Sequence, residues 1–227
     1  MEHMTLEQTY CRGPVAKLFN AQHDYIWLPN RNTGDGTYIS GTPDGYAVRL
    51  RPAMNRGEHA ALLVLANAAG ECTRLLQKMP DAAVDVLIAI ECKADMGSLY
   101  LGNPGDENAT DGWHFHQRQW WREIAVASQL PYFIAAWVYS ERKPSRVYQK
   151  NARLFLVPPE AWLATEAKLN GRKTLSLNAD LEHERAYKDI TAESEFASFA
   201  LVFDQGQWQI PANHPFWQTT LSTRRES

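Results

Sequence analysis

An apolar run near the middle of the chain ends in an acid and a lysine. Residues 84–93 are small or apolar at nearly every position before that end, and this pattern predicts a buried β-strand. Side chains alternate between the two faces of a strand, so Glu91 and Lys93 point the same way and Cys92 points back into the core. Burial of an acid and a lysine is unfavourable unless they are paired or bind something. The run therefore predicts an ion pair or a functional site at this strand end.

The remaining apolar positions alternate between helical and strand-like periodicity. Apolar residues three and four positions apart predict helices, and short runs rich in β-branched and aromatic residues predict strands. We expect a helix at 5–21 bent or split at Gly13-Pro14, strands at 24–28 and 46–50, a helix at 58–79, the strand at 84–93, a helix at 115–129, strands at 132–139 and 154–157, a helix at 158–169, a basic turn and short strand at 170–177, and a hairpin within 199–210. This order predicts an α/β fold with a mixed central sheet flanked by helices, in a single domain over residues 1–227.

Composition narrows the class of protein. The 23 Lys and Arg against 26 Asp and Glu give a formal charge of −3, which argues against a surface coated with phosphate-binding cations but leaves room for a local basic groove. Three cysteines without metal-type spacing indicate a reducing compartment. No apolar run approaches the length of a membrane span, and an apolar signal core is missing at the N-terminus. We expect a cytoplasmic protein with no membrane partner.

Two predicted strands carry the candidate chemistry. Asp44 lies where a tight turn leads into one strand, and Glu91 and Lys93 close another. The two carboxylates, with the backbone carbonyl of Cys92, form an oxygen-rich set suited to Mg²⁺, and Mn²⁺ accepts the same ligands. A water on such a metal can attack a phosphate, while Lys93 can orient or deprotonate it and offset developing charge. Without Asp44, a plain salt bridge between Glu91 and Lys93 would be an equally good explanation.

The order Gly41-Thr42-Pro43-Asp44, then Ile90-Glu91-Cys92-Lys93, resembles the PD-(D/E)XK nuclease superfamily. Other segments are similar to its Holliday junction resolvase branches, both RecU-type and archaeal. They are Glu7 as an ancillary acid on the first helix, the His116-Gln117 pair, the step Leu130-Pro131-Tyr132 from helix to strand, and the late segment from Asn170 to Leu175. The resemblance covers roughly residues 5 to 178. It departs at the long interval between Asp44 and Glu91, where a helical insertion is expected at about 51–82, and it leaves a C-terminal extension at about 179–227.

The resemblance implies a restriction-endonuclease-like core and a Mg²⁺-dependent endodeoxyribonuclease. The most specific expectation is a resolvase that cuts Holliday junctions or other branched DNA in recombination or repair, acting as a homodimer because a junction is two-fold symmetric. Asp44, Glu91 and the Cys92 carbonyl would hold the metal, and Lys93 would activate water. Glu7 and Gln117 would assist, with Gln119 as the alternative to Gln117.

Basic residues suggest where DNA would lie. The segment 141–153 is strongly basic, and such a run is either a solvated connection or a track for a DNA backbone. The residues expected to contact nucleic acid are Arg31, Arg142, Lys143, Arg146, Lys150, Arg172 and Lys173. For Trp120 and Trp121 core packing is expected over base stacking, and for His114 and His116 a surface or supporting position over a metal site.

Two alternatives remain open. The same core serves restriction- and phage-type nucleases that act on linear or flapped DNA. A different class is a DNA-binding module whose site on this fold is inactive. The intact set of Asp44, Glu91 and Lys93 argues against the inactive module.

Overall fold

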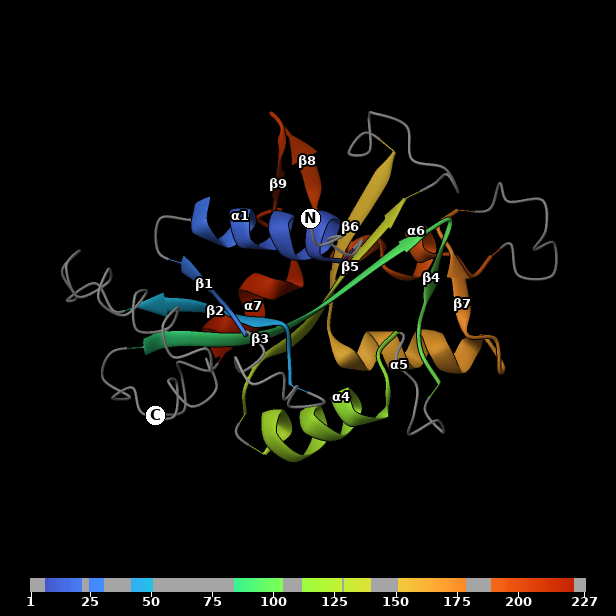
Figure 1. Ribbon diagram of the computed structural model, residues 1–227, viewed down its shortest axis with the longest axis horizontal. Helices are drawn as coiled ribbons and strands as arrows, with labels where there is room; N and C mark the ends of the chain where they lie inside the picture. The colour runs from blue at the N-terminus through green and yellow to red at the C-terminus, as the bar shows by residue number, and fades with distance from the viewer. Residues whose placement is uncertain are drawn as a thin grey trace, which may run out of the picture.

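The computed structural model describes residues 7–21, 25–30, 42–50, 84–103, 112–127, 129–139, 151–178 and 189–222. Its elements are η1 (Gln8–Arg12), α1 (Gly13–Ala21), β1 (Tyr25–Pro29), β2 (Gly45–Leu50), β3 (Val84–Met96), β4 (Ser98–Tyr100), α4 (Phe115–Trp120), η2 (Trp121–Val126), β5 (Tyr132–Tyr139), β6 (Ala152–Val157), α5 (Pro159–Lys168), β7 (Thr174–Ser176), α6 (Ala192–Glu195), η4 (Ala197–Phe199), β8 (Val202–Asp204), β9 (Gln207–Gln209) and α7 (Pro215–Ser222) (Figure 1). The predicted insertion at 51–82, Arg31 and the basic residues Arg142, Lys143, Arg146 and Lys150 lie outside the described residues.

A five-stranded mixed sheet, in the order β1-β2-β3-β5-β6, forms the centre of the fold. Neighbouring strands are antiparallel except β3 and β5, which run parallel and are connected through α4 and η2. Parallel neighbours need such a crossover because the chain must return to the same end of the sheet. The α/β class with a mixed sheet flanked by helices is therefore confirmed.

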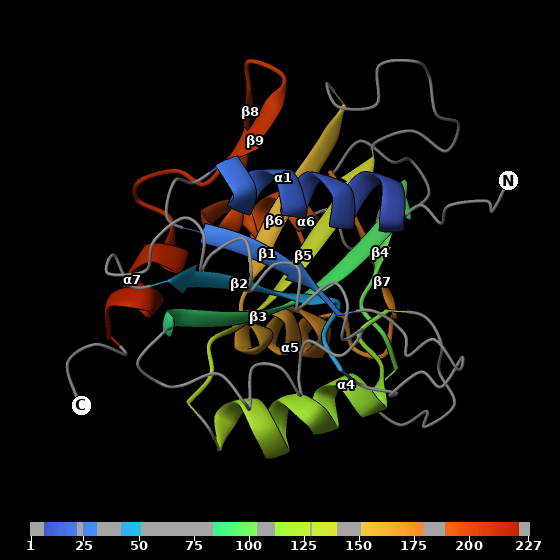
Figure 2. The ribbon, with the colours of Figure 1, turned by 60° about the vertical axis from the view of Figure 1, so that its left-hand side comes forward.

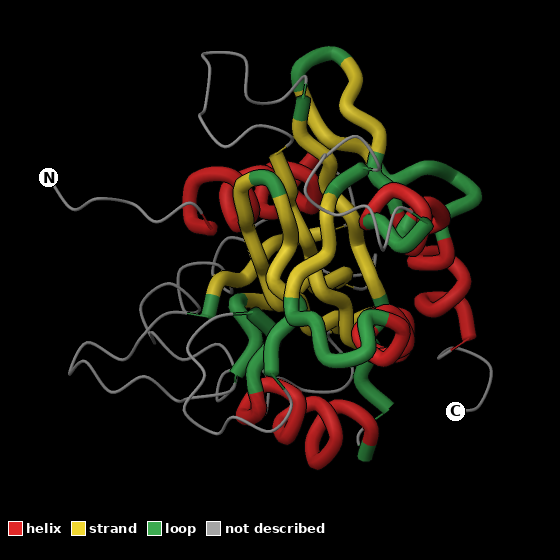
Figure 3. Tube along the Cα trace, turned by 90° about the vertical axis from the view of Figure 1, so that its right-hand side faces the viewer, coloured by secondary structure: helices red, strands yellow, loops and turns green. Residues whose placement is uncertain are grey.

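Each face of the sheet carries its own apolar cluster. Alternation along β5 sends one set of side chains to each side: Tyr132, Ile134, Ala136 and Val138 to the cluster shared with α4, η2 and α5, and Phe133, Ala135, Trp137 and Tyr139 to the cluster shared with α1 and α7. All eight are buried, as the uniformly apolar sequence of this strand requires. Figure 2 shows α1 on one side of the sheet and α4 and α5 on the other, and Figure 3 shows the strands between these helices in a third view.

The C-terminal part of the chain packs against this core. The hairpin expected within 199–210 is confirmed as β8 and β9, which turn through the positive φ angles of Gln205 (47°) and Gly206 (84°). In α7, the ring of Phe216 is fully buried and lies against those of Phe19 and Phe133. Residues 189–222 thus contribute to both faces of the sheet, Ala192 and Phe196 to the cluster with α5, and Trp208 and Phe216 to the cluster with α1.

Two helices differ from the sequence prediction in the same way. The expected helix at 115–129 becomes α4 followed by the wider π-helical η2, and the helix at 5–21 begins with the π-helical η1 before Gly13. A π-helical turn holds more residues than an α-helical turn, so it rotates the following side chains away from the expected face. Ile124, which lies four residues after Trp120 and would share its face in an α-helix, is consequently 44% exposed, whereas Trp120 is in the core and Trp121 packs against it.

Strand β3 is longer than predicted and runs on past Lys93 to Met96. Parallel pairing with β5 continues to the Met96–Tyr139 pair, and this supplies backbone partners for the extra residues. Within the described part of the chain, no helix is long and apolar enough to cross a membrane.

Candidate functional site

Asp44 is positioned by the pairing of β2 with β3. Gly45 stands opposite Ile90 in the register of these strands, so Asp44, one residue earlier, lies beside Glu91. The Cys92 backbone N–H donates to Oδ2 of Asp44 at 2.6 Å. Asp44 is buried, and its backbone carbonyl accepts a hydrogen bond from the N–H of Asn30. The turn therefore holds this carboxylate against the strand that carries Glu91 and Lys93.

Glu91 and Lys93 lie together on one face of β3, as strand alternation predicts. Nζ of Lys93 is 2.5 Å from Oε1 of Glu91, and both side chains are buried. Cys92 points to the opposite face, where it is fully buried in the cluster with α1. The expected ion pair is present, so the further contacts of this pair decide whether it is more than a salt bridge at a strand end.

Gln117 reaches the same ion pair from α4. Its Nε2 donates to Oε1 of Glu91, and the side chain is buried. The alternative residue, Gln119, is exposed and donates to Glu123 at 2.8 Å. Helix geometry separates residues two apart by about 200°, so only one of the two glutamines can face the sheet. The residue that meets Glu91 is Gln117.

Glu7 lies directly before η1, and Arg12 at the end of η1 pairs with it. Oε2 of Glu7 is 3.9 Å from Nζ of Lys93. Nη2 of Arg12 lies 2.6 Å from Oε1 of Glu7 and 2.5 Å from Oδ1 of Asp44. Sequence reasoning missed Arg12, because Glu7 and Arg12 are five residues apart and an α-helix pairs residues three or four apart. The π-helical turn makes them neighbours, and only a π-helical prediction would have found the pair.

The site contains three carboxylates and two cations, and their burial shifts the pKa values. Burial, helped by Glu7 and opposed by Arg12 and Lys93, raises the pKa of Asp44 to about 6. Burial and repulsion from Asp44 raise the pKa of Glu91 to about 8, despite the attraction of Lys93. Burial alone would lower the pKa of Lys93, but Glu91, Glu7 and Asp44 together outweigh it and raise that pKa. Lys93 is thus an ammonium at neutral pH, whereas Glu91 is largely protonated there when no metal is bound.

The donor set fits a hard divalent cation. Oε2 of Glu91 and Oε1 of Gln117 are buried and have no hydrogen-bond partner among the residues that the structure describes. Within the same residues, no three His, Cys, Asp or Glu side chains form a group that could hold a metal. A metal here would rest on Asp44, Glu91, a backbone carbonyl such as that of Cys92, and water. Mg²⁺ usually binds to few protein ligands and completes its coordination with water molecules.

The two histidines lie at the beginning of α4. The rings of His114 and His116 are 6.0 Å apart and roughly perpendicular, and both side chains are half-buried. Burial, followed by the nearby Lys93, lowers the pKa of His114 to about 4. His114 is therefore neutral at physiological pH, and its imidazole adds no positive charge beside Lys93.

Arg172 and Lys173 follow α5 and line a cavity between α5 and α4. None of the residues of the carboxylate cluster lines this cavity. Comparison of the chain with protein-family models, curated proteins and solved structures finds no match.

Proposed function

We propose that this chain is a Mg²⁺-dependent endonuclease that hydrolyses DNA phosphodiester bonds on a restriction-endonuclease-like core. Its motif order resembles that of PD-(D/E)XK nucleases, and among these the Holliday junction resolvases. Branched DNA is therefore the proposed substrate, and a homodimer the proposed assembly, because two symmetric incisions need two sites.

One observation carries this proposal. Side chains from four separate segments meet at one place: Glu7 before η1, Asp44 before β2, Glu91 and Lys93 on β3, and Gln117 on α4. A structural salt bridge between Glu91 and Lys93 would not require the buried Asp44 and the partly buried Glu7 beside it. Assembling three carboxylates in a desolvated site is costly and is typical of functional sites.

The contacts assign a role to each side chain. Mg²⁺ bound by Asp44 and Glu91 would polarise the phosphate and lower the pKa of a water. Lys93, held as an ammonium by its carboxylate neighbours, donates hydrogen bonds and offsets negative charge on the phosphate, but it cannot accept a proton in that state. Gln117 fixes the orientation of Glu91 through its amide. Arg12 holds Glu7 against Asp44.

The test is cleavage of a labelled four-way junction beside a linear duplex of matched sequence, with Mg²⁺ or with EDTA. We expect junction cleavage by the parent in Mg²⁺ only, a loss of about 100-fold or more in Lys93→Ala, and a loss of roughly 10- to 100-fold in Gln117→Ala. Lys17→Ala and Gln119→Ala are the matched controls, because both side chains are exposed and lie outside the cluster. Their cleavage rates should equal that of the parent.

Each result decides between the candidate functions. Equal cleavage of junction and duplex would support a nuclease but contradict the resolvase proposal, and the protein would then be a nuclease of linear or flapped DNA. Binding of both DNAs without cleavage in either Mg²⁺ or Mn²⁺ would contradict the proposed enzymatic activity and support a DNA-binding module.

A further inference from the structure

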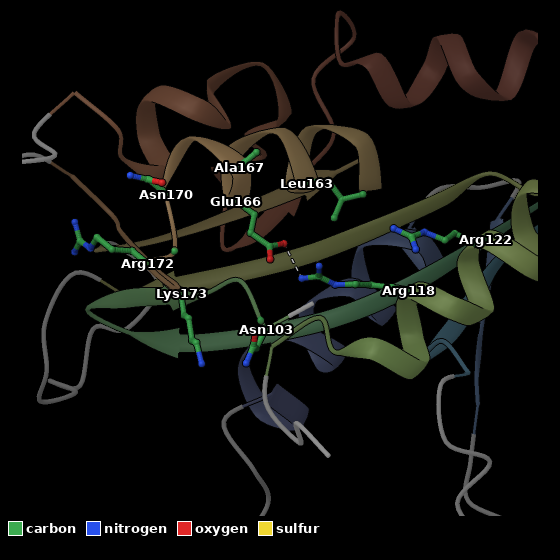
Figure 4. Close-up of a pocket in the computed structure, with 11 residues that line it drawn as sticks. Asn103, Arg118, Arg122, Leu163, Glu166, Ala167, Asn170, Arg172 and Lys173 are labelled. Carbon is green, nitrogen blue, oxygen red and sulfur yellow. Dashed lines mark hydrogen bonds and ion pairs between the residues drawn. The ribbon is translucent and has the colours of Figure 1, made fainter. Parts of the chain in front are cut away.

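A cavity of about 500 Å³ lies between α4 and α5, and none of its lining residues belongs to the carboxylate cluster. Its walls are α4 with the start of η2, one side of α5, the turn that follows α5, and the chain just after Leu101 (Figure 4). This volume lies within the range of about 300–1,000 Å³ that is usual for small-molecule sites. The cavity is therefore large enough for a phosphate group together with the sugar that carries it.

Positive charge dominates the lining. Four cations, Arg118, Arg122, Arg172 and Lys173, surround the cavity, and Glu166 is the only acid among the lining residues. In Figure 4, Arg172 and Lys173 stand at one end and Arg122 at the other, with Arg118 and Glu166 between them. The whole chain has a formal charge of −3, so this concentration of cations is local. A site of this kind favours an anion.

Arg118 forms a rigid wall of the cavity. It is 4% exposed, its Nε donates to the carbonyl of Trp113 at 2.7 Å, and its Nη2 lies 2.6 Å from Oε2 of Glu166. Its guanidinium also stacks over the ring of Trp113. Gly102 makes this packing possible: at φ +105°, a Cβ there would lie 2.7 Å from the Trp113 carbonyl and 3.2 Å from Nη2 of Arg118. The buried cation is thus preorganised, and Glu166 offsets its charge.

Glu166 offsets one cation of the four. Arg122 and Lys173 are both exposed, and neither forms an ion pair with an acid in the described part of the chain. Asn103 adds a side-chain amide beside Lys173 (Figure 4). Cations at both ends of a cavity suit a tetrahedral oxyanion, whose oxygens accept hydrogen bonds from several directions.

We infer that the α4–α5 cavity is a phosphate-binding pocket in which Arg122, Arg172 and Lys173 contact the anion and Arg118 forms the wall. The phosphate belongs either to a nucleic-acid strand or to a small phosphorylated molecule. If the phosphate belongs to a nucleic-acid strand, this inference rests on the proposed function. Adjacent residues of α4 would then serve both sites, since Gln117 contacts Glu91 and Arg118 lines the pocket.

The experiment measures binding in EDTA, so cleavage plays no part in it. A labelled single-stranded oligonucleotide and inorganic phosphate are titrated separately into the full-length parent, Arg122→Gln, Lys173→Gln and the double variant. Lys17→Gln is the matched control, because it removes an exposed lysine on α1, across the sheet from the pocket. Each substituted pocket residue is exposed, so the fold should persist, and circular dichroism checks this.

For a strand phosphate we expect the double variant to bind the oligonucleotide roughly tenfold more weakly at ~0.1 M salt, with a shallower salt dependence, while Lys17→Gln matches the parent. Saturable binding of inorganic phosphate that the double variant loses, with unchanged oligonucleotide affinity, would support the pocket and assign it to a small molecule. Unchanged binding of both ligands in the double variant would contradict the proposal that this cavity binds phosphate. The cleavage test with Lys93→Ala is independent of these outcomes, so the proposed nuclease activity and the proposed phosphate pocket can be contradicted separately.

Discussion

At the scale of single residues, Glu91 is the most deeply buried acid of the candidate site. It is 1% exposed, and it meets a cation, an amide and a second buried acid within one cluster. Burial penalises its charged form more than Lys93 stabilises it, so the direction of its pKa shift is upward. Without metal, the folded protein therefore holds a proton that the unfolded chain releases at lower pH.

This shift predicts how stability depends on pH when metal is absent. The pKa of Glu91 rises from 4.5 to about 8 on folding, so between these values the folded state binds more protons than the unfolded state. Glu91 should therefore make the free energy of unfolding decrease as pH rises through that window, and Asp44 contributes in the same direction up to about 6. The lowered pKa of His114 opposes both between about 4 and 6.5, so the decrease should be clearest above 6.5. Urea denaturation in EDTA across this range measures the slope.

Substitution separates Glu91 from the other titrating groups. Glu91→Gln should flatten the slope in the upper part of the window, because the amide does not titrate. Glu193→Gln is the control, since Glu193 is 40% exposed in a surface ion pair with Arg153. Equal slopes for the parent and Glu91→Gln would contradict the raised pKa of Glu91.

At the scale of elements, the approach of β1 to β2 holds Asp44 in place. A Cβ at Gly45 would lie 2.4 Å from Cζ2 of Trp27 and 2.8 Å from the carbonyl oxygen of Leu28. The indole is buried, and the carbonyl belongs to the backbone of a paired strand, so neither can retreat without disturbing the sheet. Only glycine fits at the position directly after Asp44.

Gly45→Ala should therefore destabilise the protein by about 2 kcal/mol or more, as expected for overpacking in a core. Gly171→Ala provides the comparison: a Cβ there meets nothing within 4 Å, and only its φ of +91° opposes substitution. We expect that change to cost about 1 kcal/mol. Urea denaturation of both variants gives the two values, and a Gly45→Ala variant no less stable than Gly171→Ala would show that the strands can separate at this point.

At the scale of the whole molecule, the C-terminal segment is part of the core. Phe216 of α7 lies 5.7 Å from Phe19 and 5.2 Å from Phe133, measured between ring centroids. These rings come from a helix near the N-terminus and a central strand, so α7 ties together elements that are far apart in the sequence. The face of the sheet that carries α1 is complete only when α7 is in place.

Phe216→Ala should accordingly lower the free energy of unfolding by about 3–5 kcal/mol, because it leaves a cavity between three elements. Val202→Ala removes an apolar side chain that is 51% exposed on β8 and should change stability by less than about 0.5 kcal/mol. Thermal or urea unfolding distinguishes the two. A small effect of Phe216→Ala would mean that α7 is dispensable for the core.

Several features of this protein could be predicted from the sequence because they depend on neighbours along the chain. The alternation along 84–93 determines that Glu91 and Lys93 share a face and that Cys92 faces the core. The apolar run 132–139 predicts a strand buried on both faces, and Pro158-Pro159 predicts where α5 begins. Each of these is a local consequence of strand or helix period and of proline's restricted backbone. The meeting of Asp44, Glu91, Gln117 and Glu7 was expected from motif order, and the structure brings these side chains together.

Tertiary structure alone decided which distant residues became neighbours. Arg12 bridges Glu7 and Asp44 only because a π-helical turn changes the spacing along the helix. Arg118 and Arg122 join Arg172 and Lys173 only because α4 and α5 pack on the same face of the sheet. Apolar patterning specifies that a face must be buried, but many partners can bury it equally well. The choice among them comes from packing of the whole chain, and that choice produced both the charge balance of the candidate site and the α4–α5 cavity.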